Sequence, residues 1–314
     1  MNAPKTPTTA ATLGSMTLFE PELVRHDPSR VEAIVKLALE EDLAQGDVTT
    51  DNMTALANLT VEADVKARVA AVVSGVSVLG MAFRLVDPEI EFFPEVSDGD
   101  TLRAGQIIAK VIGPAQSILK AERTALNLMQ HMSGVATETR RFVDVLKKCN
   151  SKTRVAHTRK TTPGLRTLEQ MAVIHGGGVP HRYNLSNAVM IKDNHLQAYA
   201  AASKNPIETS LADVIPKVPA TMYVEVEVET LAQVEAAINA GADIVLLDNM
   251  TPEMTKDAVK LIAGKAIIEA SGNIRLETLA DYANLGANVI STSKITLGAP
   301  SVDIALDFVE VKVR

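Results

Sequence analysis

The sequence predicts an α/β protein in which a small sheet module precedes a (β/α) barrel, complete or incomplete. From residue 153 onward, short β-rich runs alternate with helical segments, a pattern typical of parallel strands with right-handed crossovers. Nearly every strand candidate there ends at a polar residue. In such barrels the carboxyl ends of the strands form the rim that carries the chemistry. An open sheet would instead gather its ligand groups at a single crevice, so we favour the barrel.

Composition sets the class of protein. At 314 residues, with 46% hydrophobic and 22% charged residues, the chain is long enough for two domains or for a barrel with an appendage. No apolar run reaches the ~18 residues that would span a bilayer, and the sequence shows no export signal, so we expect a cytoplasmic protein without a membrane partner. The single cysteine, Cys149, fits a reducing compartment and a structural role. A net charge of -7, 3% aromatic residues and no Trp argue against a nucleic-acid surface.

In its first half the sequence predicts a disordered tail and two helical segments. Residues 1–16 are rich in Ala, Thr and Pro and predict a disordered tail. Apolar residues at helical spacing predict a helix over residues 28–43, with Ser29 as its N-cap. Residues 117–148 predict helix that is apolar almost all round in its first part and therefore buried, with a break at Gly134.

Residues 59–112 predict strands and turns, with a turn at residues 98–100. Residues 96–111 resemble the strand-turn-strand pattern of lipoyl and biotinyl carrier domains. A carrier needs a modifiable lysine at a hairpin tip, and the pattern shows none. We therefore expect a small sheet module without a cofactor.

The second half alternates strands and helices. The strand candidates are Arg154–His157, Ala188–Ile191, Met222–Val228, Asp243–Leu247, Ala266–Ala270 and Asn288–Ser291. The helices are Leu231–Asn239, Pro252–Ile262 and Arg275–Leu285.

Positive charge is concentrated in one stretch of this acidic chain. Residues 154–195 hold six Lys or Arg and four His against two acidic residues. Such a local inversion predicts an anion site. Guanidinium groups at Arg159 and Arg182 can bind carboxylates through two parallel hydrogen bonds, and Lys160 and Lys192 can act as point charges.

Carboxylates at later strands would balance these cations. Strict alternation over residues 223–229 puts Glu225, Glu227 and Glu229 on one face of a strand, which would point into a barrel. The alternative is a half-exposed antiparallel strand with solvated carboxylates. Asp248 follows an apolar strand and could ligate Mg²⁺ or bind a sugar hydroxyl; alternatively it caps the next helix.

Two later turns could hold a phosphate. Residues 270–273 are expected to open a helix, whose free N–H groups and Ser271 hydroxyl suit such a group. Residues 291–294 could supply a second wall and a cation. Turns of this composition also occur for purely steric reasons.

Several longer motifs resemble one family. They are HTRKTTPGLR, GGGVPHR, IKDNH, VEVEVET, GADIVLLDNM, EASGNI and ERTALNLMQHMSGVAT. Over residues 25–312 the chain resembles quinolinate phosphoribosyltransferases. The resemblance implies an N-terminal α/β sandwich domain followed by an irregular (β/α) barrel, with a tail at 1–16, domains at 17–133 and 134–298, and a segment at 299–314 that packs back on the first domain.

The resemblance also implies an activity. Quinolinate and phosphoribosyl pyrophosphate would give nicotinate mononucleotide, pyrophosphate and CO₂ with Mg²⁺, a step of NAD biosynthesis. The active form would be a homodimer or larger oligomer with shared active sites.

Each matching residue then has an implied role. Quinolinate would be bound by Arg123 from the partner subunit, Arg159, His181, Arg182 and Lys192. The phosphoribosyl donor would be bound by Thr158, Lys160, Glu227, Asp248, Ser271, Gly272, Asn273, Ser293 and Lys294. Lys160, Glu227 and Asp248 would be catalytic, and Glu227 and Asp248 would hold Mg²⁺ directly or through water.

The chain departs from the family's pattern at Gln170, Met171, Pro180, Asn273 and Ser293. These departures leave open a paralogous phosphoribosyltransferase for another aromatic acid. A non-catalytic binding protein on the same scaffold is the third alternative.

Overall fold

The computed structural model describes residues 27–313, so the tail expected at 1–16 lies outside the described residues. Within these residues the chain forms two compact units, each of which is described by itself. The antiparallel-sheet unit comprises residues 27–141, 160–178 and 294–313, and the parallel-sheet unit comprises residues 142–159 and 179–293.

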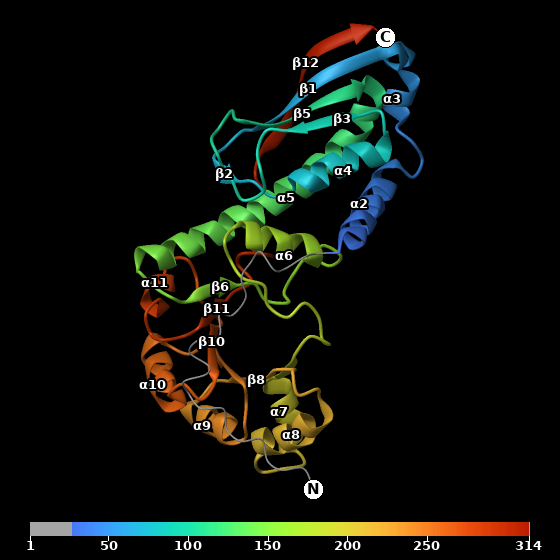
Figure 1. Ribbon diagram of the computed structural model, residues 1–314. Coiled ribbons are helices and arrows are strands. Elements are labelled where there is room, and N and C mark those ends of the chain that lie inside the picture. Colours follow the sequence, from blue (N-terminus) through green and yellow to red (C-terminus); the bar gives the residue numbers. More distant parts are fainter. Residues whose placement is uncertain (1–26, 314) are drawn as a thin grey trace. The chain divides into compact units, whose positions relative to one another are not determined.

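The antiparallel-sheet unit is built on a four-stranded sheet with the order β12-β1-β5-β3. Its strands are β1 (Leu59–Ala67), β3 (Glu91–Pro94), β5 (Ile107–Pro114) and β12 (Ile304–Val313), and β2 (Ala71–Val72) pairs with β4 (Thr101–Leu102) separately. Strand β12 runs antiparallel to β1, so the last described segment lies beside the first strand. Figure 1 shows helices α4 and α5 along one side of this sheet.

Helix α4 (Val76–Val86) lies within residues 59–112, where the sequence predicted only strands and turns. That prediction was wrong, because a short apolar run does not distinguish a strand from a buried helix. The helix start also depends on a distant residue: Asp98 Oδ1 accepts hydrogen bonds from the backbone N–H groups of Gly75 at 2.7 Å and Val76 at 3.0 Å. The turn at 98–100 was predicted correctly, with Gly99 at φ 93°. The Asp98 carboxylate in this turn binds two of the backbone N–H groups that have no partner inside the helix at its start.

The helix predicted at 28–43 is confirmed as α2 (Pro28–Leu43), but its N-cap is Asp27 and not Ser29. Asp27 Oδ1 accepts from the Ser29 backbone N–H at 2.9 Å. Pro28 suits the first helical position, whose N–H has no partner inside the helix. The remaining short helices of this unit are α3 (Val48–Asn52), η2 (Thr54–Asn58) and α6 (Arg166–His175).

Helix α5 (Ala115–Lys148) is continuous, so the break predicted at Gly134 is wrong. A Cβ at Gly134 would collide with the carbonyl oxygen of Pro300 and lie 3.2 Å from the Cα of Ser301. Glycine at position 134 therefore allows the backbone of Pro300 and Ser301 to pass close to the helix. Beside it the Val302 backbone N–H donates to the Gln130 carbonyl at 3.1 Å, which holds the segment leading into β12 against the helix.

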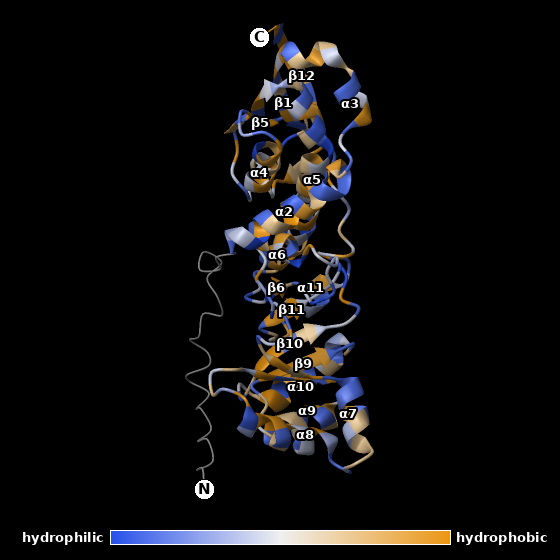
Figure 2. Ribbon diagram, turned by 90° about the vertical axis from the view of Figure 1, so that its right-hand side faces the viewer, coloured by the Kyte–Doolittle hydropathy of each residue, from blue (hydrophilic) through white to orange (hydrophobic). Residues whose placement is uncertain are grey.

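The parallel-sheet unit contains a six-stranded sheet with the order β6-β11-β10-β9-β8-β7, in which every pairing is parallel. All six strands were predicted; they are β6 (Arg154–Ala156), β7 (Val189–Ile191), β8 (Val224–Val228), β9 (Ile244–Asp248), β10 (Ile267–Ser271) and β11 (Val289–Ser291). Among residues 27–313 no ladder joins β6 to β7, so the barrel is incomplete. Figure 2 shows the apolar character of β9 and β10, whose residues are mostly buried.

Helices alternate with these strands. They are α7 (Asp193–Ala200), α8 (Pro206–Val214), η3 (Ile215–Lys217), α9 (Leu231–Asn239), α10 (Pro252–Ile262) and α11 (Leu279–Tyr282). Helices α9 and α10 have the predicted bounds, whereas α11 is shorter than the predicted Arg275–Leu285. None of the helices between residues 27 and 313 combines the length and the apolar character that crossing a bilayer requires.

Replacing Gly134 by Ala should destabilise the protein although Ala favours helix. The added Cβ meets the Pro300 backbone, and such overpacking typically costs about 1–3 kcal/mol. Urea unfolding of the two proteins measures the difference. Asn127→Ala, at an exposed position of the same helix, is the matched control and should leave the midpoint unchanged or raise it slightly. A Gly134→Ala protein as stable as the wild type would contradict the close approach.

Candidate active site

The carboxyl ends of the parallel strands bring most of the predicted site residues to one edge of the sheet. Ser271 and Asp248 are directly paired in register at the ends of β10 and β9. Ser291 ends β11, and Lys192 follows β7. Because neighbouring parallel strands end on the same side, these polar groups converge without any long loop.

His157, directly after β6, is fully buried and orients its neighbours. Its Nε2 accepts from the backbone N–H of His181 at 3.1 Å. The proton must therefore sit on Nδ1, which donates to the Thr158 carbonyl at 2.8 Å. His157 thus fixes where the segment carrying His181 and Arg182 crosses the strand ends.

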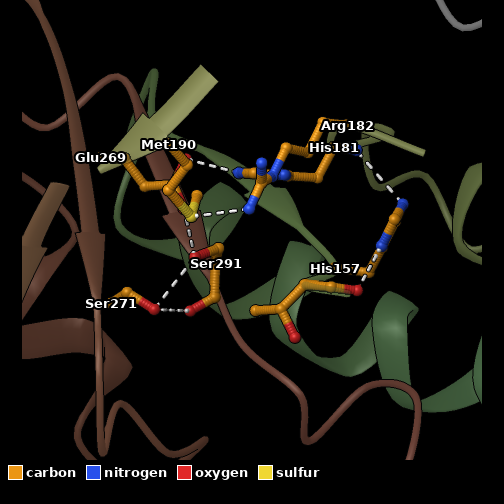
Figure 3. A network of polar contacts seen from close by, with 8 residues as sticks. His157, His181, Arg182, Met190, Glu269, Ser271 and Ser291 are labelled. Atoms are coloured by element: carbon orange, nitrogen blue, oxygen red, sulfur yellow. Dashed lines mark hydrogen bonds and ion pairs between the residues drawn. The ribbon is translucent and has the colours of Figure 1, made fainter. Parts of the chain in front are cut away.

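Arg182 is held in place by groups that do not neutralise it. Its guanidinium contacts Met190 Sδ at 3.1 Å (Figure 3) and donates to the Ala188 carbonyl at 3.2 Å. Its buried Nε has no hydrogen-bond partner among the described residues. Burial, followed by repulsion from Arg159, lowers the pKa of Arg182. A bound anion would offset the electrostatic repulsion between these two guanidinium groups.

Two buried carboxyl groups face His181. One ligand atom each from His181, Glu225 and Glu269 lies within 4.8 Å of the others. Burial, and then the neighbouring Glu269 carboxylate, raises the pKa of Glu225 to about 8, so Glu225 holds a proton at neutral pH. Burial alone would lower the pKa of His181, but the charge and hydrogen bond of Glu269 raise it. The three groups are thus tied together by the hydrogen bond between Glu269 and His181 and by the proton on Glu225, rather than forming a set of bare metal ligands.

Glu269 connects this cluster to the next strand. Its Oε2 lies 3.1 Å from His181 Nε2, and its Oε1 accepts from the Ser291 hydroxyl at 2.5 Å. Ser291 Oγ in turn lies 3.0 Å from Ser271 Oγ. In Figure 3 the Ser291 side chain lies between Glu269 and Ser271.

The turn after β10 does not open a helix, which corrects the prediction for residues 270–273. Gly272 at φ 80° and Asn273 at φ 53° form a left-handed turn instead. A Cβ at Gly272 would lie 2.6 Å from both Asp248 Oδ1 and the Asn249 backbone N. The glycine is thus required for the β9 and β10 turns to meet. Exposed backbone groups of such a turn can still bind an anion.

Asp248 is not a helix cap, because the N-cap of α10 is Thr251, whose hydroxyl accepts from Met254. Asp248 is half-buried and its Oδ2 accepts from Asn249 Nδ2 at 2.7 Å, which leaves carboxylate lone pairs at the strand end. Glu227 lies one strand away, near the end of β8, and is also half-buried. Carboxylate oxygens are the ligands that Mg²⁺ prefers, so this donor set fits the ion.

The parallel context also decides the conformation of the Glu-rich strand. Strand β8 pairs in parallel with β7 and β9, so the half-exposed antiparallel alternative is wrong. Exposure rises along the strand, from 2% at Glu225 through half-buried Glu227 to exposed Glu229. The carboxylates therefore pass from the interior to the rim.

A cleft of about 330 Å³ lies beside Glu227, but it is not the anion site. Its lining includes the carboxylates of Asp193, Glu227 and Glu229 and contains no Lys or Arg. A diacid or phosphate would be repelled there without a bound cation.

The four histidines of residues 154–195 have different roles. His195 Nδ1 accepts from the Lys192 backbone N–H at 3.1 Å and so stabilises the start of α7. His175 Nδ1 lies 2.8 Å from Ser74 Oγ in the antiparallel-sheet unit. With His157 these two are structural, so the histidine density that predicted an anion site overstated it. His181 is the member that faces the carboxyl cluster.

Three predicted site residues belong to the antiparallel-sheet unit. Arg123 is exposed on α5, with its guanidinium 3.7 Å from Glu122. Lys160 is exposed, and its carbonyl accepts from Thr296 Oγ1 at 2.9 Å. Lys294 is exposed and lies in the turn segment that follows β11. Their roles remain predictions.

The predicted members in the parallel-sheet unit are Thr158, Arg159, His181, Arg182, Lys192, Glu227, Asp248, Ser271, Gly272, Asn273 and Ser293. Sequence reasoning missed Glu269 as a site residue, included Ser291 only in the possible second wall of a phosphate site, and left Glu225 without a role. A signal existed for Glu269, since it is the one charged residue in the apolar run Ala266–Ala270.

Comparisons with known proteins agree with this geometry. Family models described as the N-terminal and C-terminal domains of quinolinate phosphoribosyl transferase match residues 47–133 and 135–307. The chain belongs to the quinolinate phosphoribosyltransferase family. The resemblance of its motifs is thereby confirmed.

Relatives cover most of the chain. A probable nicotinate-nucleotide pyrophosphorylase (carboxylating) from Bacillus subtilis is 37% identical over 267 residues, 85% of this chain and 89% of that protein. A chloroplastic nicotinate-nucleotide pyrophosphorylase (carboxylating) from Arabidopsis thaliana is 38% identical over 90% of this chain and 83% of its own length. The crystal structure of NadC from Streptococcus pyogenes aligns with a TM-score of 0.84 and 37% identity over 93% of this chain and 99% of that one. The family's fold, with an α/β N-terminal part and a barrel-like part, is that of this chain.

Stability should fall as the pH rises from about 4.5 to 8, partly because of Glu225. The folded protein keeps the Glu225 proton up to about pH 8, whereas an unfolded chain loses it near its ordinary value of 4.5. Since the folded state binds more protons in this window, raising the pH favours unfolding. Glu225→Gln stays neutral and should lose less stability between pH 5 and 8, by an amount on the order of a few kcal/mol.

Urea unfolding in EDTA at several pH values measures this difference. Glu229→Gln, an exposed position just after the same strand, is the matched control and should reproduce the wild-type slope. Equal slopes for wild type and Glu225→Gln would show that Glu225 is ionised in the fold.

Proposed function

We propose that this protein transfers the phosphoribosyl group from phosphoribosyl pyrophosphate to quinolinate with loss of CO₂, giving nicotinate mononucleotide and pyrophosphate. The observation that carries the proposal is the cationic pair Arg159 and Arg182 beside His181, set against carboxylates at the next strand ends. The names of the relatives support the same reaction.

The cations would bind the acceptor. Arg159, Arg182 and Lys192 offer charge-assisted hydrogen bonds to two carboxylates, and His181 would add a further donor. Arg182 is already oriented through the Ala188 carbonyl, so little side-chain freedom would be lost on binding. The aromatic nitrogen is then presented in line with the ribose.

The carboxylates would act on the donor. As pyrophosphate leaves, positive charge develops on the ribose, and Glu227 and Asp248 are placed to stabilise it. The same two residues would hold Mg²⁺, which when bound would neutralise the pyrophosphate. Ser271 and the turn at Gly272 and Asn273 would bind the 5′-phosphate.

Decarboxylation then needs no further charged group. Once ribosylated, the ring nitrogen is positive, so loss of the 2-carboxylate as CO₂ leaves its electron pair beside a cation. A proton then completes the product. The protein's part is to hold the ring in place and neutralise the second carboxylate.

The substrate assay separates this proposal from its alternatives. With phosphoribosyl pyrophosphate and Mg²⁺, we expect quinolinate to release CO₂ and pyrophosphate in equal amounts, and EDTA to stop the reaction. Nicotinate, which lacks the 2-carboxylate, should be turned over at least tenfold more slowly, since one charge-assisted interaction is lost. A preference for nicotinate would favour the paralogous transferase, and no turnover of either acid would favour a binding protein.

We further propose a cytoplasmic homodimer in which Arg123 completes the partner's site. Arg123 is exposed on α5, as a residue that serves another chain must be. The free Cys149 fits the reducing compartment.

Arg123→Ala and Lys192→Ala should each abolish activity, and mixing them should restore part of it. After random subunit exchange half the dimers are hybrids, each with one intact site, so about a quarter of wild-type activity is expected. Mixing Lys192→Ala with Asp248→Ala is the control, because both lesions affect a chain's own site and no hybrid is intact. Failure of the first mixture after verified exchange would rule out the shared site.

A further inference from the structure

The chain of hydrogen bonds through Glu269 joins two positions that the proposed function assigns to different substrates. His181 lies at the acceptor end and Ser271 at the phosphate end. Between them stand Glu269 and Ser291, both buried, with 5% and 1% of their surface exposed. Burial excludes water from this connection, so each proton position in it depends on its neighbours.

The available acceptors determine where the Ser291 and Ser271 hydroxyl protons point. The Ser291 hydroxyl has one proton and two acceptors in reach, Glu269 Oε1 at 2.5 Å and Ser271 Oγ at 3.0 Å. The charged carboxylate is the stronger acceptor, so the proton points to Glu269. The Ser271 hydroxyl is then free to donate to the Ser291 carbonyl, 3.2 Å away.

We propose that Glu269 and Ser291 form a relay that positions His181 and Ser271 together and so couples the two substrates. When a phosphate accepts the Ser271 proton in place of the Ser291 carbonyl, the stronger hydrogen bond polarises the Ser271 hydroxyl and makes its Oγ a better acceptor for the Ser291 hydroxyl. The Ser291 proton is then shared between Ser271 and Glu269, so the hydrogen bond to Glu269 Oε1 weakens and the other Glu269 oxygen binds the His181 N–H more strongly. His181 is thereby better aligned for a carboxylate. Glu269 and Ser291 are positioning residues in this proposal, which rests on the proposed function for the roles of His181 and Ser271.

The test begins with Ser291→Ala, which breaks the relay while leaving His181 beside Glu269. Its KM for phosphoribosyl pyrophosphate should rise roughly tenfold, with a smaller change in kcat, because Ser271 keeps the backbone carbonyl of residue 291 as an acceptor but loses the hydroxyl that donates to its Oγ. Ser291→Thr keeps the hydroxyl and should restore most of the affinity. Glu269→Gln should raise the KM of both substrates, since it alters both connections.

Coupling is measured by calorimetry of quinolinate with and without ribose 5-phosphate. In the wild type the sugar phosphate should tighten quinolinate about fivefold, within the usual range of coupling between sites. In Ser291→Ala this factor should fall to about one. Ser210→Ala, which removes another buried serine hydroxyl in the same unit, is the matched control and should keep the wild-type values.

Several results would overturn the relay. They are unchanged KM values and coupling in Ser291→Ala, a fall in kcat alone, or no rescue by Thr in a protein whose thermal melting shows that it is folded. A wild type that binds quinolinate without coupling to ribose 5-phosphate would overturn it too, while its turnover of quinolinate would still support the proposed function. If the wild type neither binds nor turns over quinolinate, both proposals fall. Should Glu269→Gln not fold, the two Ser291 variants still decide.

Discussion

The structure of the parallel-sheet unit depends on keeping acidic side chains inside a sheet that is otherwise apolar. Burying a lone carboxylate is costly, and a group in that position neutralises itself or finds a cation. Glu225 does the first, with its pKa raised to about 8, and Glu269 does the second, through His181 and Ser291. Glu269 thereby holds His181, one of the residues proposed to bind the acceptor, in position before any substrate arrives. A site made in advance in this way spends less binding energy on ordering its own side chains.

The same arrangement explains why the cations lie where they do. Burial, followed by repulsion from Arg159, lowers the pKa of Arg182, and the sheet's carboxylates offset that effect only in part. An incoming diacid would supply the missing negative charge. Within the parallel-sheet unit, the positive charge of Arg159 and Arg182 thus lies beside acidic residues of β8 and β10.

Secondary structure was predicted most accurately where the hydrophobic periodicity and the residue types indicate the same element. All six strands of the parallel sheet and helices α9 and α10 were predicted from the alternation of β-rich and helical runs, and in the structure the two helices are capped locally by Thr230 and Thr251. The errors arise where a distant residue decides. The first backbone N–H groups of helix α4 are bound by Asp98, which is 22 residues from Val76 in the sequence, and Gly134 makes room for Pro300 rather than ending a helix. Glu269 was missed because its partners come from residues 181 and 291, which no local pattern connects.

Two of the residues that depart from the family's pattern, Asn273 and Gln170, have a clear structural environment. Asn273 is one of these departures, and its φ of 53° lies in the left-handed region that Asn tolerates better than most residues. Its side chain donates to Asn249 Oδ1 at 2.9 Å, so the substitution ties the β10 turn to the β9 turn. Gln170 is buried on α6, next to Glu169, whose carboxylate is already engaged by His131 and by the Thr162 backbone N–H. Because neither change removes a charged group from the anion site, the charge set that favours a diacid is intact, and any shift in acceptor preference would have to come from the shape of the pocket.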